Sequence, residues 1–442
     1  MDPAGFISRN AAAAVLHSVL ARHHALDDAL TQIGQQDPFR SMSLRDRAFT
    51  RVIVATVLRR LGQLDEVLGR FVTKPLPEKR GKLREILLSA AAQLLFLATP
   101  PHAAISLAVD QAKADGGARR FAGLANAVLR RVASEGPMVL AGQDAARLNT
   151  PEWLWQRWSA NYGEERARAI AESHLAEAPL DLSFKTAAEA ADWAGRLDGV
   201  VLPTGSVRVK AHGPIDAMPG FEDGAWWVQD AAAALPARLL GDVAGLRVAD
   251  LCAAPGGKTA CLAAAGARVT AVELAADRID RMQQNLRRLH LEAEIVRADV
   301  TQWRPAALFD AVLLDAPCSA TGTIRRHPDI PHLKRATDLI KLAETQHLLL
   351  ASAMGLVRPG GRLIYCTCSL EPEEGLQRIT SSLAEAPGWR LLPIEAGELG
   401  LEPGWITQEG CLRTLPCDRF REFPESGGID GFFAARLIHS AE

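Results

Sequence analysis

The fold is decided by residues 247 to 259, which read Arg247-Val-Ala-Asp-Leu-Cys-Ala-Ala-Pro-Gly-Gly-Lys-Thr259. The apolar run from Leu246 to Leu251 is followed at once by the turn residues Pro255-Gly256-Gly257 and by a helix-like segment, 259–265. This order of strand, glycine turn and helix is how a doubly wound α/β sheet opens its ligand crevice. The glycines allow a ligand to approach the backbone closely, and the start of the following helix offers N–H groups to a polar ligand.

An acidic residue adds weight to this interpretation. Glu273 ends the next apolar run, where a carboxylate of such a sheet accepts hydrogen bonds from a ribose diol. Beyond Gly241, predicted strands alternate with predicted helices: strands 247–251, 268–273, 294–297, 309–315 and 361–366, and helices such as 276–288 and 339–357. Alternation of this kind predicts a parallel sheet with crossover helices and a ligand at the carboxyl ends of the strands.

The front of the chain has a different pattern. From Ala11 to about Ala133 the apolar residues recur at spacings of three and four, which predicts an all-α bundle. The predicted segments include 51–61, 64–71, 83–98, 104–114 and 120–132. Residues 136–149 are expected to form a linker to a small α/β module with strands 180–184 and 200–209 around a helix, 187–197. We therefore expect three domains, at 1–140, 141–225 and 226–442.

Composition and charge narrow the class of protein. The 442 residues are 48% hydrophobic and 23% charged, which is typical of globular proteins. The net charge of −2 hides an asymmetry, because residues 1–135 carry 19 Lys and Arg against 12 Asp and Glu. A basic first domain indicates a polyanionic partner, although a plain solvated helical surface explains the excess equally well. Three tryptophans, Trp153, Trp155 and Trp158, are interpreted as core more readily than as platforms for bases.

The sequence also indicates a compartment. No apolar run reaches the roughly 18 residues that a membrane span needs, and Met1-Asp-Pro is not the start of a signal segment. The seven cysteines are odd in number and lack C-x-x-C pairs, which is typical of reduced thiols. We expect a cytoplasmic protein that acts as a monomer, without a membrane partner and without a bound metal.

Each predicted strand of the second half ends on a residue with useful chemistry. The first strand leads into Cys252 to Lys258 and the third into Asp299, whereas Asp315-Ala-Pro-Cys318 and Cys366-Thr-Cys368 follow the fourth and fifth. A thiolate and an acid in one pocket suit attack on an electron-poor ring. Inert packing remains the alternative for any single cysteine.

These blocks carry a resemblance to a known family. Residues 250–259, 313–322 (Leu-Leu-Asp-Ala-Pro-Cys-Ser-Ala-Thr-Gly) and 365–374 (Tyr-Cys-Thr-Cys-Ser-Leu-Glu-Pro-Glu-Glu) resemble the signature blocks of the RNA cytosine-5 methyltransferases, the Fmu/Sun or Nol1/Nop2/Sun family. Residues 325–330, 430–433 and 126–131 are similar to the members that act on bacterial 16S rRNA. In those members a domain similar to the antitermination factor NusB and a small RNA-binding module precede a Rossmann-like methyltransferase. The resemblance covers nearly the whole chain.

The resemblance implies a reaction and a set of site residues. A methyl group of S-adenosyl-L-methionine would pass to carbon 5 of a cytosine in 16S rRNA. Cys368 would attack carbon 6, Cys318 would assist product release, and Asp315 would hydrogen-bond the base. The implied cofactor-binding residues are Cys252, Ala253, Ala254, Pro255, Gly256, Gly257, Lys258, Glu273, Asp299 and Asp315, and the implied RNA-binding residues are Arg325, Arg326 and His327.

Four other interpretations compete with this one. The same chemistry could act on tRNA or 23S rRNA. A P-loop nucleotidase is suggested by Gly257-Lys258-Thr259, but Cys252 stands where the leading glycine of that motif belongs. A non-catalytic RNA-binding or antitermination protein would leave the cysteine pair without a purpose. Zinc binding by Cys366, Cys368, Cys411 and Cys417 is disfavoured by their spacing.

Overall fold

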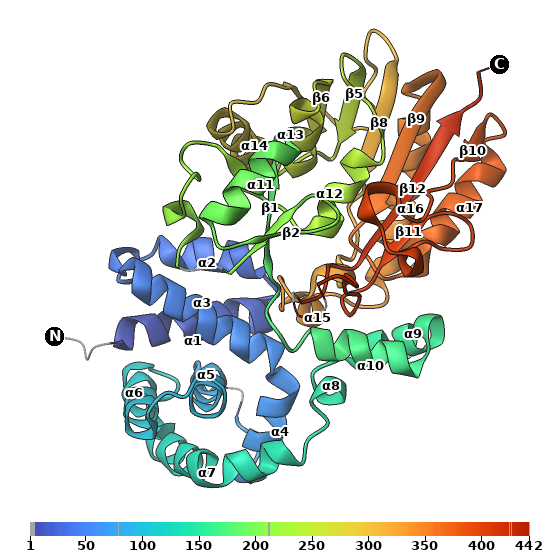
Figure 1. Ribbon diagram of the computed structural model, residues 1–442. Helices are drawn as coiled ribbons and strands as arrows, with labels where there is room; N and C mark the ends of the chain where they lie inside the picture. Colours follow the sequence, from blue (N-terminus) through green and yellow to red (C-terminus); the bar gives the residue numbers. More distant parts are fainter. Residues whose placement is uncertain (1–4, 78, 211–212, 424, 426, 442) are drawn as a thin grey trace. The chain divides into compact units, whose positions relative to one another are not determined.

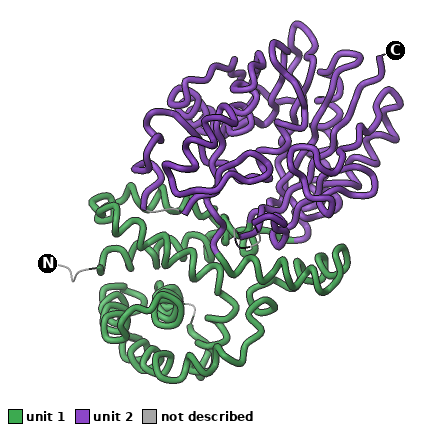
Figure 2. Tube along the Cα trace, in the orientation of Figure 1, with its two compact units in different colours: residues 1–176, 324–335 green, residues 177–323, 336–442 purple. Residues whose placement is uncertain are grey.

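The computed structural model describes residues 5–77, 79–210, 213–423, 425 and 427–441, so Met1-Asp-Pro lies outside the described residues. The chain forms two compact units (Figure 2). The first unit contains residues 1–176 together with the separate segment 324–335, and the second contains residues 177–323 and 336–442. The division at residue 176 differs from the predicted domain boundaries at 140 and 225, because two helices beyond residue 150 belong to the first unit.

The first unit is all α-helical, as the apolar spacing predicts (Figure 1). Its helices are α1 (Phe6–Arg22), α2 (Leu26–Gly34), α3 (Leu44–Arg59), α4 (Leu61–Phe71), α5 (Leu83–Leu95), α6 (Pro101–Ala114), α7 (Ala122–Ala141), α8 (Ala145–Leu148), α9 (Glu152–Tyr162), α10 (Glu164–Ser173) and α15 (Ile330–Leu333). Apolar stripes of these helices meet in one core, in which Leu16, Ile53, Leu88 and Leu129 are fully buried. Trp158 of α9 is also fully buried, in agreement with its interpretation as core.

The predicted linker at 136–149 is wrong. Helix α7 continues through Gly136 and Pro137 to Ala141, and α8 follows within the same stretch. A proline inside a helix removes one backbone hydrogen bond. Here Val139 and Leu140 pack against the core beyond it, so that tertiary burial outweighs the local penalty.

The segment 324–335, which we call the arm, is built into the first unit by hydrogen bonds between side chains and backbone groups. Arg59 of α3 donates to the carbonyl oxygen of Arg325 at 2.8 Å, and the carboxylate of Asp329 accepts from the backbone N–H of Leu26 at 2.8 Å. Nε2 of His332 lies 2.9 Å from the carbonyl oxygen of Leu58. The arm therefore belongs to the helical unit, although the residues on either side of it in sequence belong to the other unit.

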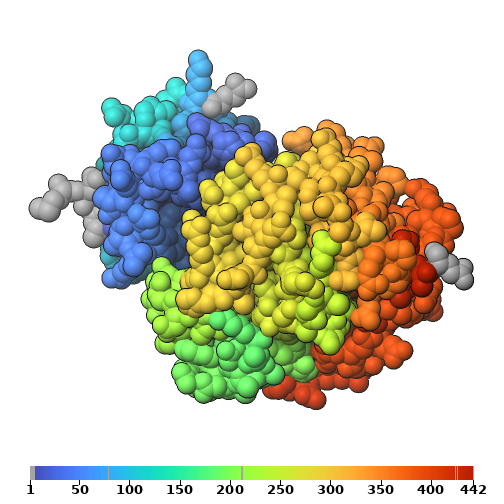
Figure 3. Space-filling view, turned by 90° about the horizontal axis from the view of Figure 1, so that it is seen from above, coloured from blue at the N-terminus to red at the C-terminus, as the bar shows by residue number. Residues whose placement is uncertain are grey.

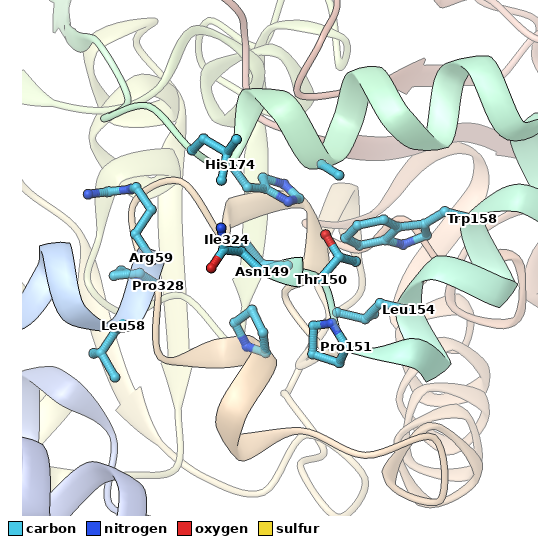
Figure 4. Close-up of a pocket in the computed structure, with 13 residues that line it drawn as sticks. Leu58, Arg59, Asn149, Thr150, Pro151, Leu154, Trp158, His174, Ile324 and Pro328 are labelled. Atoms are coloured by element: carbon cyan, nitrogen blue, oxygen red, sulfur yellow. The ribbon is translucent and has the colours of Figure 1, made fainter. Parts of the chain in front are cut away.

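A small buried cavity of about 20 Å³, room for about one water molecule, lies inside the first unit (Figure 4). Side chains of α3, α9, α10 and the arm line it, among them Arg59, Trp158, His174 and Pro328. The His174 ring packs edge-on against Trp158 with centroids 5.3 Å apart. Burial, together with the positive charges of Arg325 and Arg59, lowers the pKa of His174 to about 3, so the ring is neutral at pH 7.

The second unit begins with a small antiparallel sheet in the order β2-β3-β1-β4, covered by α11 (Ala187–Arg196). Its strands are β1 (Leu180–Phe184), β2 (Val200–Val201), β3 (Val207–Val209) and β4 (Trp226–Val228). The single strand predicted at 200–209 is a hairpin instead. Its Pro-Thr-Gly-Ser turn places Gly205 at φ +82, a left-handed conformation that glycine adopts without strain.

The larger sheet has the order β10-β12-β9-β8-β5-β6-β7, with β11 paired to β12 (Figure 1). Its strands are β5 (Arg247–Leu251), β6 (Arg268–Glu273), β7 (Glu294–Arg297), β8 (Phe309–Asp315), β9 (Val357–Thr367), β10 (Trp389–Leu391), β11 (Leu412–Thr414) and β12 (Phe432–His439). The helices of this part of the unit are α12 (Ala231–Arg238), α13 (Gly257–Ala264), α14 (Ala276–Arg288), α16 (Asp338–Met354) and α17 (Leu376–Glu385). Strands β5 to β9 are parallel, as predicted, whereas β10 to β12 form an antiparallel edge that the sequence did not predict.

Within this unit, hydrogen bonds join the small sheet to a helix of the larger sheet. In Figure 3 its green residues lie directly beside the yellow residues of the larger sheet's first half. The guanidinium of Arg288, the last residue of α14, donates to the carbonyl oxygens of Phe221 at 2.7 Å and Trp226 at 3.2 Å. Gly224 lies so close to Arg288 that a Cβ atom would stand 1.8 Å from its carbonyl oxygen. Only glycine fits there.

In the part of the chain that the structure describes, the helices are all too short or too polar to cross a membrane.

Candidate active site

The glycine turn joins β5 to α13 and is braced by α14. Gly256 adopts φ +98, and a Cβ atom there would lie 2.8 Å from the Met282 side chain. Arg278 donates to the carbonyl oxygen of Ala254 at 2.6 Å, and Asn285 donates to that of Pro255 at 3.1 Å. Side chains of α14 therefore hold the loop that begins at Cys252 in one conformation.

The predicted ribose-binding acid lies at this loop. Glu273 is 4% exposed, and its Oε1 accepts the backbone N–H groups of Leu274 at 2.9 Å and Ala275 at 3.1 Å. Its Oε2 lies 3.3 Å from Arg278 and 3.4 Å from the backbone nitrogen of Ala254. The structure thus brings Glu273 and the glycine turn together, as the order of the strands predicts.

Asp299 follows β7, and its carboxylate organises its own turn. Oδ1 accepts from the hydroxyl of Thr301 at 2.7 Å and from its backbone N–H at 2.9 Å. These two hydrogen bonds lower the pKa of Asp299. The described contacts of Asp299 are thus local ones.

A second acid, Asp250, lies beneath the loop, and the sequence analysis did not single it out. It is fully buried at the end of β5 and accepts a 2.6 Å hydrogen bond from the hydroxyl of Thr259. Burial raises the pKa of Asp250 to about 7, in spite of the opposing effects of Thr259 and Lys258. The signal in the sequence was an acid within the short apolar run at 248–251.

Lys258 and Asp315 form an ion pair at the carboxyl ends of β5 and β8, with Nζ and Oδ2 2.7 Å apart. Burial by itself would lower the pKa of Lys258, but the Asp315 carboxylate more than compensates and raises it above the usual value. The Cys366 thiol lies 3.5 Å from the other carboxylate oxygen, and the ring of Phe432 lies beneath the ammonium at 5.1 Å. The sequence had left the partner of Lys258 open, and Phe432 was not predicted as part of the site.

The thiols of Cys318 and Cys368 lie 3.5 Å apart. Backbone hydrogen bonds join the two loops that carry them, from the nitrogen of Ala316 to the oxygen of Cys366 at 3.0 Å and from that of Gly322 to the oxygen of Cys368 at 2.9 Å. The hydrogen bond to Cys368, burial and nearby negative charge raise the pKa of Cys318 well above its usual range. Cys318 therefore keeps its proton where an ordinary thiol would lose it.

The three residues expected to face RNA differ in exposure. His327 is exposed and Arg326 is half-buried, but Arg325 is only 4% exposed. The prediction for Arg325 is therefore corrected. Its neighbours Ile324 and Pro328 line the cavity of the helical unit, and its own carbonyl oxygen accepts a hydrogen bond from Arg59.

The parallel strands, the glycine turn and the strand-end acid define a Rossmann-like methyltransferase unit, preceded by an all-α domain. Comparisons with known proteins agree with this class. A family model described as 16S rRNA methyltransferase RsmB/F matches residues 238–438, and one described as the NusB family matches residues 7–134.

Relatives match over nearly the full length. The chain is 34% identical over 446 residues to a Cronobacter sakazakii protein named ribosomal RNA small subunit methyltransferase B, covering 97% of this chain and 98% of that protein. A protein of the same name from Xanthomonas campestris pv. campestris is 36% identical over 455 residues, with 99% and 98% covered. The chain belongs to the 16S rRNA methyltransferase RsmB/F family, which is a family of S-adenosyl-L-methionine-dependent enzymes.

A solved structure shows the same fold. The crystal structure of the protein PH0851 aligns with a TM-score of 0.76 at 22% identity, covering 97% of this chain and 98% of that one. The predicted fold class, an all-α NusB-like domain ahead of a Rossmann-like methyltransferase, is thus confirmed. The family model and the relatives also confirm the predicted class of enzyme, an rRNA methyltransferase dependent on S-adenosyl-L-methionine.

Proposed function

We propose that this protein transfers a methyl group from S-adenosyl-L-methionine to carbon 5 of a cytosine in 16S rRNA. The observation that carries the proposal is the pair of thiols, Cys318 and Cys368, 3.5 Å apart beside the ion pair of Asp315 with Lys258. Membership of the family and the names of the relatives supply the class of substrate. Reduced thiols and an rRNA substrate also fit a cytoplasmic location.

The residues at the glycine turn fit the cofactor. Buried Glu273 offers carboxylate oxygens for a ribose diol, and the turn at Gly256 allows close approach to the backbone. Lys258 is placed beside both the turn and Asp315, and we assign it to this site together with residues 252–257 and Asp299. Bound S-adenosyl-L-methionine would supply an electrophilic methyl group.

Carbon 5 of cytosine is a poor nucleophile, so a thiolate must first add to carbon 6. We assign this attack to Cys368, which makes carbon 5 enamine-like and able to take the methyl group. Removal of the carbon 5 proton then restores the double bond as the bond between sulfur and carbon 6 breaks. The protonated Cys318 thiol stands next to the departing sulfur, and Asp315 can hydrogen-bond the ring as its charge develops.

The target base is expected to be unstacked, because a side-chain thiol cannot reach carbon 6 inside a helix. Arg326 and His327 of the arm, together with the basic first unit, are the proposed contacts to the RNA backbone. The first unit and the small sheet are assigned to RNA binding and the larger sheet to catalysis.

The experiment uses wild type, Cys318→Ala, Cys368→Ala and, as a matched control, Cys417→Ala. Each is incubated with 16S rRNA and methyl-labelled S-adenosyl-L-methionine and analysed on a denaturing gel. We expect Cys318→Ala to accumulate a labelled protein–RNA adduct, Cys368→Ala to give neither adduct nor product, and Cys417→Ala to behave as wild type.

An adduct that requires Cys318 instead would exchange the two roles. Labelling of tRNA or 23S rRNA in place of 16S rRNA would move the reaction to another RNA. Absence of any labelling by the wild type would overturn the proposal.

A further inference from the structure

We propose that Glu374 is a positioning residue that fixes the distance between the two thiols from beneath their loops. The inference rests on the proposed function, because it concerns the cysteines assigned to that reaction. Glu374 lies in the short turn Pro372–Glu374 after β9 and is fully buried. In the sequence, Glu374 is the last residue of the family block 365–374. None of its hydrogen bonds given below involves the sulfur of Cys318 or Cys368.

The carboxylate of Glu374 is bound to the loop of Cys318. Its Oε1 accepts the backbone N–H of Ser319 at 2.9 Å and a side-chain N–H of Gln346 at 3.0 Å. Its Oε2 accepts the hydroxyl of Ser319. With three donors aimed at two oxygens, the group acts as an acceptor, which is the role of an ionised carboxylate.

The backbone of the same residue is bound to the strand that leads to Cys368. The carbonyl oxygen of Glu374 accepts the hydroxyls of Tyr365 at 3.0 Å and Thr367 at 3.1 Å. Glu374 is therefore hydrogen-bonded to β9 through its main chain and to the Cys318 loop through its side chain. A change in its side chain would release one loop and leave the other in place.

Two hydrogen bonds complete the connection between the loops. The hydroxyls of Ser319 and Ser369, which directly follow the two cysteines, lie 3.0 Å apart. Thr321 accepts the backbone N–H of Leu370 at 3.0 Å. Ser319, Thr321 and Ser369 are each at most 1% exposed. In such a low-dielectric setting, satisfied hydrogen bonds hold a unique geometry.

The reaction explains why this geometry matters. One thiol must attack the base and the other must assist release from the same base, so the relative position of the sulfurs decides the rate. A misplacement of about 1 Å can cost about 100-fold in rate. The glycine turn after β5 and the Glu273 carboxylate at the end of β6 share none of the hydrogen bonds described for Glu374, so we expect cofactor binding to be independent of Glu374.

The test compares wild type with Glu374→Gln, with the milder Ser319→Ala and with a matched control, Glu344→Gln, on the exposed face of α16. The amide of Glu374→Gln turns one acceptor into a donor that faces other donors. Diamide accepts the two thiol hydrogens and leaves a disulfide, and peptide mass analysis follows the Cys318–Cys368 bond. This readout needs neither RNA nor cofactor, so it is independent of the proposed function.

We expect disulfide formation to be slowed about tenfold in Glu374→Gln, less in Ser319→Ala, and not at all in Glu344→Gln. The kcat for methyl transfer should fall about 100-fold in Glu374→Gln while its KM for S-adenosyl-L-methionine changes less than about twofold. If Glu374→Gln does not fold, as judged by circular dichroism, Ser319→Ala decides by the same readouts.

Wild-type rates of disulfide formation in both variants would overturn the inference, and so would a loss of activity that comes entirely from a raised KM for the cofactor. If the disulfide slows as expected but the wild type methylates no RNA, the proposed function fails and the positioning of the thiols stands.

Discussion

At the scale of single residues, the site depends on partners that offset one another's charge. Lys258 lies in the first turn of α13 and Asp315 at the end of β8, so their ion pair joins two elements of the unit. The pair keeps an ammonium beside Asp315 at every physiological pH, because Asp315 holds the pKa of Lys258 above its usual value. Removal of the Lys258 ammonium would leave the Asp315 carboxylate beside the Cys366 thiol, without its ion-pair partner.

We predict that Lys258→Met lowers kcat/KM for methyl transfer by at least about 100-fold, because the proposed reaction would lose the positive charge that offsets Asp315. Initial rates measured with labelled cofactor check this, with the exposed Lys341→Met as control. A Lys258→Met enzyme with the rate of the wild type would show that the ion pair is structural only.

At the scale of elements, the arm makes a cap for a helix far away in sequence. Helix α2 has Ala25 at its N-cap, which offers no side-chain hydrogen bond, and Asp329 accepts the N–H of Leu26 in its place. A carboxylate at a helix N-terminus also interacts favourably with the helix dipole.

Asp329→Ala should therefore destabilise the helical unit by about 1 kcal/mol and loosen the start of α2. Hydrogen exchange of the amides of residues 26–29 measures the loosening, and denaturant unfolding gives the free energy. Asp280→Ala, an exposed aspartate on α14, serves as the control. Unchanged exchange at α2 would mean that the cap carries no stability.

Elements were predictable where their signal is local. The strand β5 and the turn after it were predicted because an apolar run and two glycines stand next to each other. The end of α7 was missed because a distant core, and not the proline itself, decides it. The antiparallel strand β12 (Phe432–His439) has little alternation and is defined by its pairing with β9. Arg325 is buried in an arm that is hydrogen-bonded to α3 through Arg59 and Leu58. Such contacts between distant segments leave no periodic pattern in the sequence.

At the scale of the whole molecule, two compact units are built from four stretches of sequence, with the arm returning to the first unit after almost 150 residues in the second. The return has an electrostatic consequence inside the first unit. Arg325 of the arm and Arg59 of α3 both lie near His174, which follows α10. Burial and these two positive charges act in the same direction and oppose protonation of the ring.

This arrangement predicts how stability depends on pH. The pKa of His174 is about 3 in the folded protein and about 6.5 in the unfolded chain, so the unfolded state binds the proton more readily. The stability of the first unit is therefore greatest above pH 6.5 and falls as the pH drops from there toward 3, by up to about 1.4 kcal/mol per pH unit from this group.

His174→Phe removes the titrating ring and keeps an aromatic contact with Trp158, and should flatten this slope. Urea unfolding followed by circular dichroism at pH 7, 6 and 5 gives the slope for wild type, for His174→Phe and for the exposed control His102→Phe. If His174→Phe loses stability between pH 7 and 5 as steeply as the wild type does, protonation of His174 does not limit the acid stability of the unit and other groups must account for it.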